Sequence, residues 1–317
     1  MHLNKLHKTA ACIALGLVMP SAVLASKNTS NHAPESESIK VPATTDRNAS
    51  AATTDLRKQI SSEATAAIGE TKLALTKLSQ GEKEAALKSL ERAAGKLDII
   101  LARDPDLALA PVNVTTTTYE LLADVKQAKG MRSKAEELLE EGQVQAARRV
   151  LQNLASETVI HVTNIPLATY PSAIKEAVKL ADSGNLDKAK VTLETALNTL
   201  VVTDTVIPLP VATAQAELKD AEKLAEQANR KAEDNKRLEQ LLANARTQLE
   251  LGQVLGYGTK DSFKQIYAEL DEVNSKISGD KYGIGFFDHI KSSIANLLNK
   301  PTDSPQAGQT QSQSATR

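Results

Sequence analysis

Apolar positions between residues 55 and 300 recur mostly at helical spacing, and they return in the same order around three glycines. Relative to Gly81, Gly142 and Gly184, an alanine stands seven residues earlier, another alanine five residues later and a leucine nine residues later. We expect each glycine to join two helices, because glycine readily takes the positive φ that ends a helix. The alanines would let the helices approach, and the leucines would enter a shared core. These positions are Ala74, Ala135 and Ala177, then Ala86, Ala147 and Ala189, then Leu90, Leu151 and Leu193.

Extended segments rich in β-branched residues and containing proline follow the three hairpins, at residues 109–114, 159–167 and 206–211. Proline and β-branched side chains disfavour helix there, and the alternation of apolar residues indicates burial. We therefore expect an all-α, mainly helical fold of hairpin repeats with short proline-containing connectors that form a minor two- or three-stranded sheet. The glycines are 61 and then 42 residues apart, which excludes a regular tetratricopeptide solenoid.

The pattern from about Val211 to Leu251 predicts one long helix. Its apolar residues alternate at spacings of three and four, as in a coiled-coil seam, until Asn235 interrupts them. A helix of this length would span about 60 Å, so we expect a long hairpin arm or an oligomer interface. Glycines at positions 252, 256 and 258 would end it, and further helices are expected at about 261–277 and 286–298.

The first 25 residues predict export. Lys5 and Lys8 precede an apolar stretch, residues 10–24, and a Val-Leu-Ala sequence ends at Ala25, where a signal peptidase would cleave. The apolar stretch has about 15 residues, fewer than the roughly 20 that a membrane span needs. We expect cleavage after Ala25 and a periplasmic product with no stable membrane span.

Cysteine content and charge limit the chemistry of that product. Cys12 is the only cysteine, and it lies at the start of the apolar stretch, which argues against a lipid attachment site. Cleavage would leave a chain without disulfides, thiolate nucleophiles or cysteine metal ligands. The 38 basic and 39 acidic residues nearly balance, so we expect no attraction to nucleic acid.

Composition divides the exported chain into three parts. Residues 26–54 are rich in Ser, Thr, Asn, Ala and Pro and predict a disordered tether, and residues 301–317 predict a disordered tail. Residues 55–300, rich in strong helix formers, predict one helical domain.

Three histidines follow the predicted cleavage site: His32, His161 and His289. Their spacing matches no metal-ligand motif, so we predict no metal site. His161 lies between Ile160 and Val162 in an extended connector, which favours a structural role. It is also our candidate pH sensor, because histidine gains charge in mildly acidic surroundings.

Other motifs admit two interpretations each. The glutamate pairs 136–137 and 140–141 could be imagined as catalytic carboxylates, but the basic residues around them favour a solvated helix face. The glycines of 252–258 follow a helix and precede no Gly-Lys-Ser/Thr sequence, unlike a phosphate loop. An apolar stripe from Phe286 to Leu297 could contact a membrane or a client, although such stripes are more often core. We predict no catalytic residue and no cofactor.

The signal peptide, the Ala-x6-Gly-x4-Ala-x3-Leu hairpins and the connectors Leu109-Ala-Pro-Val112 and Val206-Ile-Pro-Leu209 together resemble the YfdX family of exported proteins. The resemblance covers roughly residues 55–300, and it is strongest to the versions found in heat-resistance gene clusters. It implies an all-α periplasmic protein connected with heat and acid stress, and it supplies no catalytic residues.

Two functions follow as hypotheses. The first is a periplasmic stress-protection protein, chaperone-like, that binds unfolding proteins through apolar helix faces without nucleotide. The second is an envelope scaffold or small-ligand-binding module. We expect a homo-oligomer in either case, and an enzyme is the weakest interpretation.

Overall fold

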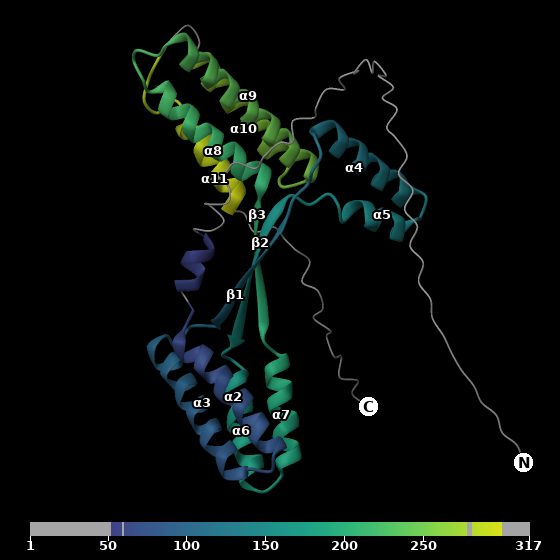
Figure 1. Ribbon diagram of the computed structural model, residues 1–317, viewed down its shortest axis with the longest axis vertical. Coiled ribbons are helices and arrows are strands. Elements are labelled where there is room, and N and C mark those ends of the chain that lie inside the picture. The colour runs from purple at the N-terminus through teal and green to yellow at the C-terminus, as the bar shows by residue number, and fades with distance from the viewer. Residues whose placement is uncertain (1–51, 59, 278–280, 300–317) are drawn as a thin grey trace, which may run out of the picture. The chain divides into compact units, whose positions relative to one another are not determined.

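The computed structural model describes residues 52–58, 60–277 and 281–299. Within these residues, three helical hairpins alternate with three strands, and four further helices follow (Figure 1). The hairpins are α2 and α3 (Ser62–Ser79, Lys83–Arg103), α4 and α5 (Val125–Glu140, Val144–Leu151), and α6 and α7 (Tyr170–Asp182, Leu186–Asn198). The strands are β1 (Leu109–Tyr119), β2 (Glu157–Pro166) and β3 (Val201–Pro208), and the last helices are α8 (Leu209–Ala225), α9 (Ala232–Leu255), α10 (Lys260–Ile277) and α11 (Asp288–Asn299). The expected mainly helical fold with a minor sheet is confirmed.

All three hairpins turn at their glycine in the same way. Gly81, Gly142 and Gly184 have φ values of 75°, 74° and 81°, which only glycine adopts without strain. The residue after each glycine donates its backbone N–H to the carbonyl oxygen five residues earlier, which is the Schellman arrangement. These bonds run from Glu82 to Lys77 (2.9 Å), from Gln143 to Leu138 (2.8 Å) and from Asn185 to Leu180 (2.8 Å).

The first and third hairpins pack together into a four-helix bundle. Helix α2 contacts α7 and α3 contacts α6, so the first helix of each hairpin meets the second helix of the other. The Nζ of Lys83 donates to the carbonyl oxygen of Asp182 at 2.6 Å, which places both glycine turns at the same end of the bundle. Leu90 and Leu193 are fully buried in its core, together with the repeated alanines of both hairpins.

The three strands form one antiparallel sheet with β2 in the centre. On one face, Val114, Ile160 and Val162 form a small buried cluster with apolar residues of the segment 52–60. The third strand begins earlier than its predicted connector and ends at Pro208. Residues 209–211 were expected to be extended, but they begin α8, because Pro210 lies in the first helical turn, where its missing N–H is not needed.

Helices α8 to α11 enclose a separate buried core that includes Leu218, Leu249 and Phe263. The single long helix expected from Val211 to Leu251 is wrong, since the chain reverses between α8 and α9, which pack against each other. The guanidinium of Arg230 stabilises the reversal by donating to the carbonyl oxygens of Ala225 (3.0 Å) and Lys281 (2.8 Å).

The apolar stripe after residue 285 belongs to the core of α8 to α11. Phe287, Ile290 and Ile294 are at most 1% exposed. Of the two interpretations of this stripe, the structure supports core packing.

Several expectations concern residues outside those described: the signal peptide with its cleavage at Ala25, the tether through residue 51, His32 and the 301–317 tail. Residues 52–58 are helical, although the expected tether includes their first three positions. Among the described helices, none combines the length and the apolar character that crossing a membrane requires.

Candidate functional site

The second hairpin differs from the other two in its packing. No residue of α4 or α5, both fully described, belongs to the three buried clusters, and α4 contacts α9 instead of another hairpin. Between this hairpin and the end of α9 lies a groove of about 930 Å³, here called the hairpin groove. Its lining includes the apolar residues Leu139, Leu151, Leu154, Val254 and Leu255 and the charged residues Lys129, Arg132, Glu136 and Lys260.

The repeat shows which residues of the groove are unusual. Four residues of α2 and four of α6 face the shared core and are buried or partly buried. They stand thirteen, ten, six and three residues before the glycine of their hairpin. They carry no charge in either helix, whereas three of the four are charged and exposed in α4. The residues are Ile68, Thr71, Leu75 and Leu78 in α2; Pro171, Ile174, Val178 and Ala181 in α6; and Lys129, Arg132, Glu136 and Leu139 in α4.

Two leucines of the second hairpin remain accessible, although its alanines at the repeat positions are buried. Leu90 and Leu193 are 0% exposed, but Leu151 at the equivalent position is 46% exposed. The expectation that all three leucines enter a shared core is therefore wrong for Leu151, because no other hairpin covers α4 and α5. Leu139 is 48% exposed, whereas its equivalents Leu78 and Ala181 are buried.

Charge in the groove is predominantly positive. The Nε of Arg132 donates to Glu136 at 2.9 Å, so these two charges offset each other. Lys129 and Lys260 have no ion-pair partner among the described residues. The groove thus combines accessible leucines with two uncompensated cations.

The opposite wall of the groove is held at the turn after α9. Gly256 ends α9 with a φ of 85°. The next residue, Tyr257, accepts the backbone N–H of Ser156 at 2.8 Å through its hydroxyl oxygen. Burial raises the pKa of this phenol, and the hydrogen bond holds the wall beside the chain that leaves α5.

The sequence did not lead us to predict the groove or its basic residues, although a signal for Arg132 and Glu136 exists. Comparison of the three repeats at the alanine and leucine positions shows only what they share. Extended to ten and six residues before the glycine, the same comparison finds Arg132 and Glu136 where the other hairpins have uncharged residues. A charged residue in one repeat, where the others have uncharged residues, indicates a position that is not buried in the common core.

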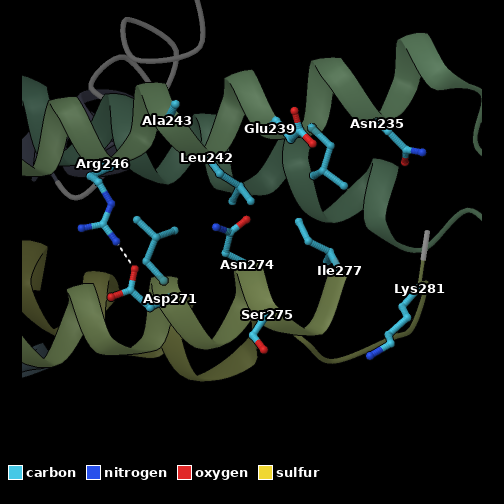
Figure 2. A pocket seen from close by; sticks show the side chains of 12 residues that line it. Asn235, Glu239, Leu242, Ala243, Arg246, Asp271, Asn274, Ser275, Ile277 and Lys281 are labelled. Carbon is cyan, nitrogen blue, oxygen red and sulfur yellow. Dashed lines mark hydrogen bonds and ion pairs between the residues drawn. The ribbon is translucent and has the colours of Figure 1, made fainter. Parts of the chain in front are cut away.

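A second groove, of about 910 Å³, lies between α9 and α10 (Figure 2). Its lining is more polar and includes Glu239, Arg246, Asp271 and Asn274. Arg246 and Asp271 form an ion pair across it, and the Arg246 guanidinium lies 5.5 Å from the centre of the Tyr267 ring. Burial raises the pKa of Tyr267 to about 12, and its ring lies beneath the cation.

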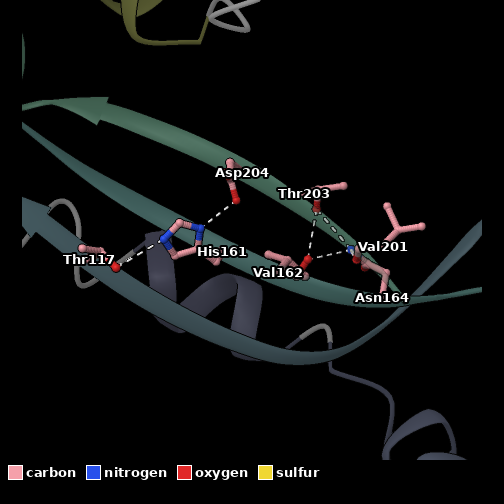
Figure 3. Close-up of polar contacts among 7 residues, drawn as sticks. All are labelled: Thr117, His161, Val162, Asn164, Val201, Thr203 and Asp204. Atoms are coloured by element: carbon pink, nitrogen blue, oxygen red, sulfur yellow. Dashed lines mark hydrogen bonds and ion pairs between the residues drawn. The ribbon is translucent and has the colours of Figure 1, made fainter. Parts of the chain in front are cut away.

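The third candidate is His161 on β2 (Figure 3). Its Nδ1 lies 2.7 Å from a carboxylate oxygen of Asp204 on β3, and its Nε2 lies 3.3 Å from the hydroxyl of Thr117 on β1. The ring therefore links all three strands, which supports the structural role. The predicted role in pH sensing stays a prediction.

Comparison with known proteins assigns the repeat region. Residues 67–206 match the family model described as YfdX protein. This match relates the segment 67–206 to the YfdX family. A solved structure of Salmonella Typhi YfdX is 19% identical, with an alignment that covers 47% of this chain and 93% of that one at a TM-score of 0.34. The comparison with curated proteins found no match.

The YfdX match runs from α2 into β3. It includes the three hairpins and the strands between them, whereas helices α8 to α11 follow it. The hairpin side of the groove therefore belongs to the YfdX segment, and the wall at residues 253–260 comes from the part that follows.

The remaining predicted residues are dispersed. The hinge glycines Gly81 and Gly184 lie together at one end of the α2–α3–α6–α7 bundle, and Gly142 lies at the tip of the second hairpin. Glu136 and Glu137 form exposed ion pairs with Arg132 and Lys134, as a solvated helix face would. Within the described residues, histidine, aspartate and glutamate form no cluster of three that could hold a metal ion.

Proposed function

We propose that this protein protects against stress by holding apolar segments of unfolding proteins in the hairpin groove, in the periplasm and without nucleotide. The match of residues 67–206 to the YfdX family supports a role connected with stress. The observation that carries the proposal is the exposure of Leu139 and Leu151 at positions that are buried in the other hairpins.

The groove suits a transient apolar ligand. Clustered accessible leucines provide apolar area, and exposed apolar clusters commonly mark interaction sites. The charged residues Lys129, Arg132 and Glu136 keep water in the groove, so that it stays open when empty. Binding by burial of apolar area is not directional, which allows clients of different sequence.

This role requires binding and release, and it assigns no residue to catalysis. The energy for release would come from refolding of the client, which removes its apolar segment from the groove.

An aggregation assay tests the proposal. A model client is heated with stoichiometric purified protein, with the double variant Leu139→Asp/Leu151→Asp, or with the control Leu73→Asp/Val191→Asp, whose side chains are 42% and 61% exposed on other helices. We expect the wild type and the control to suppress light scattering and the groove variant to lose most of this effect. Failure of the wild type, or equal suppression by both variants, contradicts the proposal.

A second candidate function is the binding of a small polar ligand between α9 and α10, favoured by the Arg246–Asp271 pair and the neighbouring Asn274 (Figure 2). A metabolite panel tests it, because a ligand that binds only the folded state raises the melting temperature. The shift should disappear in Arg246→Ala.

A further inference from the structure

Helix α4 carries its charges in two blocks of opposite sign. The half that begins at Val125 is basic, and the half that ends at the glycine turn is acidic. The basic residues are Lys126, Lys129, Arg132 and Lys134, and the acidic residues are Glu136, Glu137, Glu140 and the capping Glu141.

This arrangement opposes the dipole of the helix. A helix is stabilised by acidic side chains in its first turn and basic ones in its last turn, and α4 has neither, apart from the Asp124 carboxylate that caps its N-terminus. Two pairs within the helix, Arg132–Glu136 and Lys134–Glu137, both at 2.9 Å, offset some of the charge. Both are exposed, and such pairs contribute little to stability. Lys129 and Glu140 form no ion pair with any described residue.

Two such helices complement each other when they run in opposite directions. The acidic end of one then lies beside the basic half of the other, and a two-fold axis repeats the contact. Lys129 and Glu140 are eleven residues apart, about 16 Å along a helix. When two copies of α4 overlap over this length in opposite directions, Lys129 of each copy lies beside Glu140 of the other.

We propose that the α4–α5 hairpin docks on the same hairpin of a second copy of this chain, with the two α4 helices antiparallel. Glu140 and Glu141 at the tip of each hairpin face Lys129 and Arg132 of the other. Leu139 and Leu151 of both copies are covered in the same contact.

A second copy fits better than another hairpin of the same chain. The α2–α3 and α6–α7 hairpins are already paired with each other, through α2 with α7 and α3 with α6. Of the three hairpins in the described residues, α4–α5 is the one that does not pack on another hairpin. The unpaired hairpin of a second copy is available and has the matching charges.

This contact does not depend on client binding, but it uses the hairpin groove. A dimer therefore keeps the accessible leucines covered, and clients compete with the second copy for them.

Charge reversal tests the contact in solution. Sedimentation equilibrium measures dimerisation of the wild type and of two double variants, Lys129→Glu/Arg132→Glu and Glu140→Lys/Glu141→Lys. Two controls carry the same change in net charge on exposed residues of other helices: Lys72→Glu/Lys188→Glu and Glu84→Lys/Glu194→Lys. We expect each α4 variant to dimerise about tenfold more weakly than its control, a change of the size that interfacial charges produce.

An equimolar mixture of the two α4 variants tests the contact most directly. One variant is then basic along α4 and the other acidic, so they should form a mixed dimer at least as tight as the wild type. The proposal is overturned by a wild type that stays monomeric, by α4 variants that match their controls, or by a mixture that forms no mixed dimer. A wild type that dimerises as expected but does not suppress client aggregation would count against the proposed function alone.

Discussion

Arg132 in α4 occupies the position that Ile174 occupies in α6, ten residues before the glycine turn. Ile174 is fully buried against the first hairpin, and Arg132 is exposed at the hairpin groove. One repeat pattern therefore produces both a core and an open surface, and the difference lies in a few side chains.

Truncation of equivalent leucines should have unequal effects. Leu90→Ala removes a fully buried side chain and should lower the free energy of unfolding by about 2–5 kcal/mol. Leu151→Ala should cost less than about 1 kcal/mol, because water already reaches that side chain. Urea unfolding followed by circular dichroism measures both, and equal losses would show that Leu151 is core.

Two glycines of the second hairpin should respond in opposite directions to alanine. Gly142 has a φ of 74°, where an L-residue is strained, so Gly142→Ala should destabilise by about 1–2 kcal/mol. Gly130 lies within α4, and an added Cβ there meets nothing within 4 Å. Gly130→Ala should stabilise by about 0.5–1 kcal/mol. The same sign for both substitutions in thermal unfolding would refute the assignment of Gly142 as the hinge.

Glu63 should contribute stability that acid removes. Hydrogen bonds from the Ser62 hydroxyl and from its own backbone N–H, together with the nearby Arg103 guanidinium, lower the pKa of this carboxyl to about 2. Because the folded-state pKa lies below the unfolded value, the contribution is complete above about pH 5 and is lost as the pH falls towards 2. Glu63→Gln should therefore lower the melting temperature at pH 7, and the gap to the wild type should narrow at pH 3. Glu194→Gln is the control, and a gap that widens in acid would contradict this assignment.

Arg230 should hold the reversal between α8 and α9. Its guanidinium bonds to the carbonyl oxygens of Ala225 and Lys281 at once, and hydrogen bonds from charged groups contribute about 1.5–3 kcal/mol each. Arg230→Ala should speed amide hydrogen exchange at the end of α8 and leave α2 and α3 unchanged. Arg230→Lys should not restore protection, since an ammonium lacks the planar fork. Full protection in Arg230→Ala would show that the turn forms without it.

Local features of the fold could be predicted from the sequence. The positive φ at Gly81 and Gly142 follows from a local requirement, and the connectors around Pro111 and Pro166 carry their own β-branched signal. These elements therefore appear where they were expected. The break after Ala225 could not be predicted in this way, because one of the contacts at this turn, the carbonyl of Lys281, is 51 residues from Arg230.

The exposure of Leu151 depends on which hairpins pair. The alanine and leucine offsets are identical in the three repeats, so they cannot reveal that the first hairpin packs on the third. The charges at Arg132 and Glu136 carry that information, and they are readable only when the repeats are compared position by position.

A photo-cross-linking amino acid placed at position 151 tests the central claim most directly. A second variant of the same protein carries the cross-linking amino acid at position 191, where the valine is 61% exposed on α7. Both probes are therefore accessible. On irradiation with a heated, unfolding client, we predict cross-links to the client from position 151 and few from position 191. Equal yields from the two positions, or none from position 151, would contradict the assignment of the hairpin groove as the client-binding site.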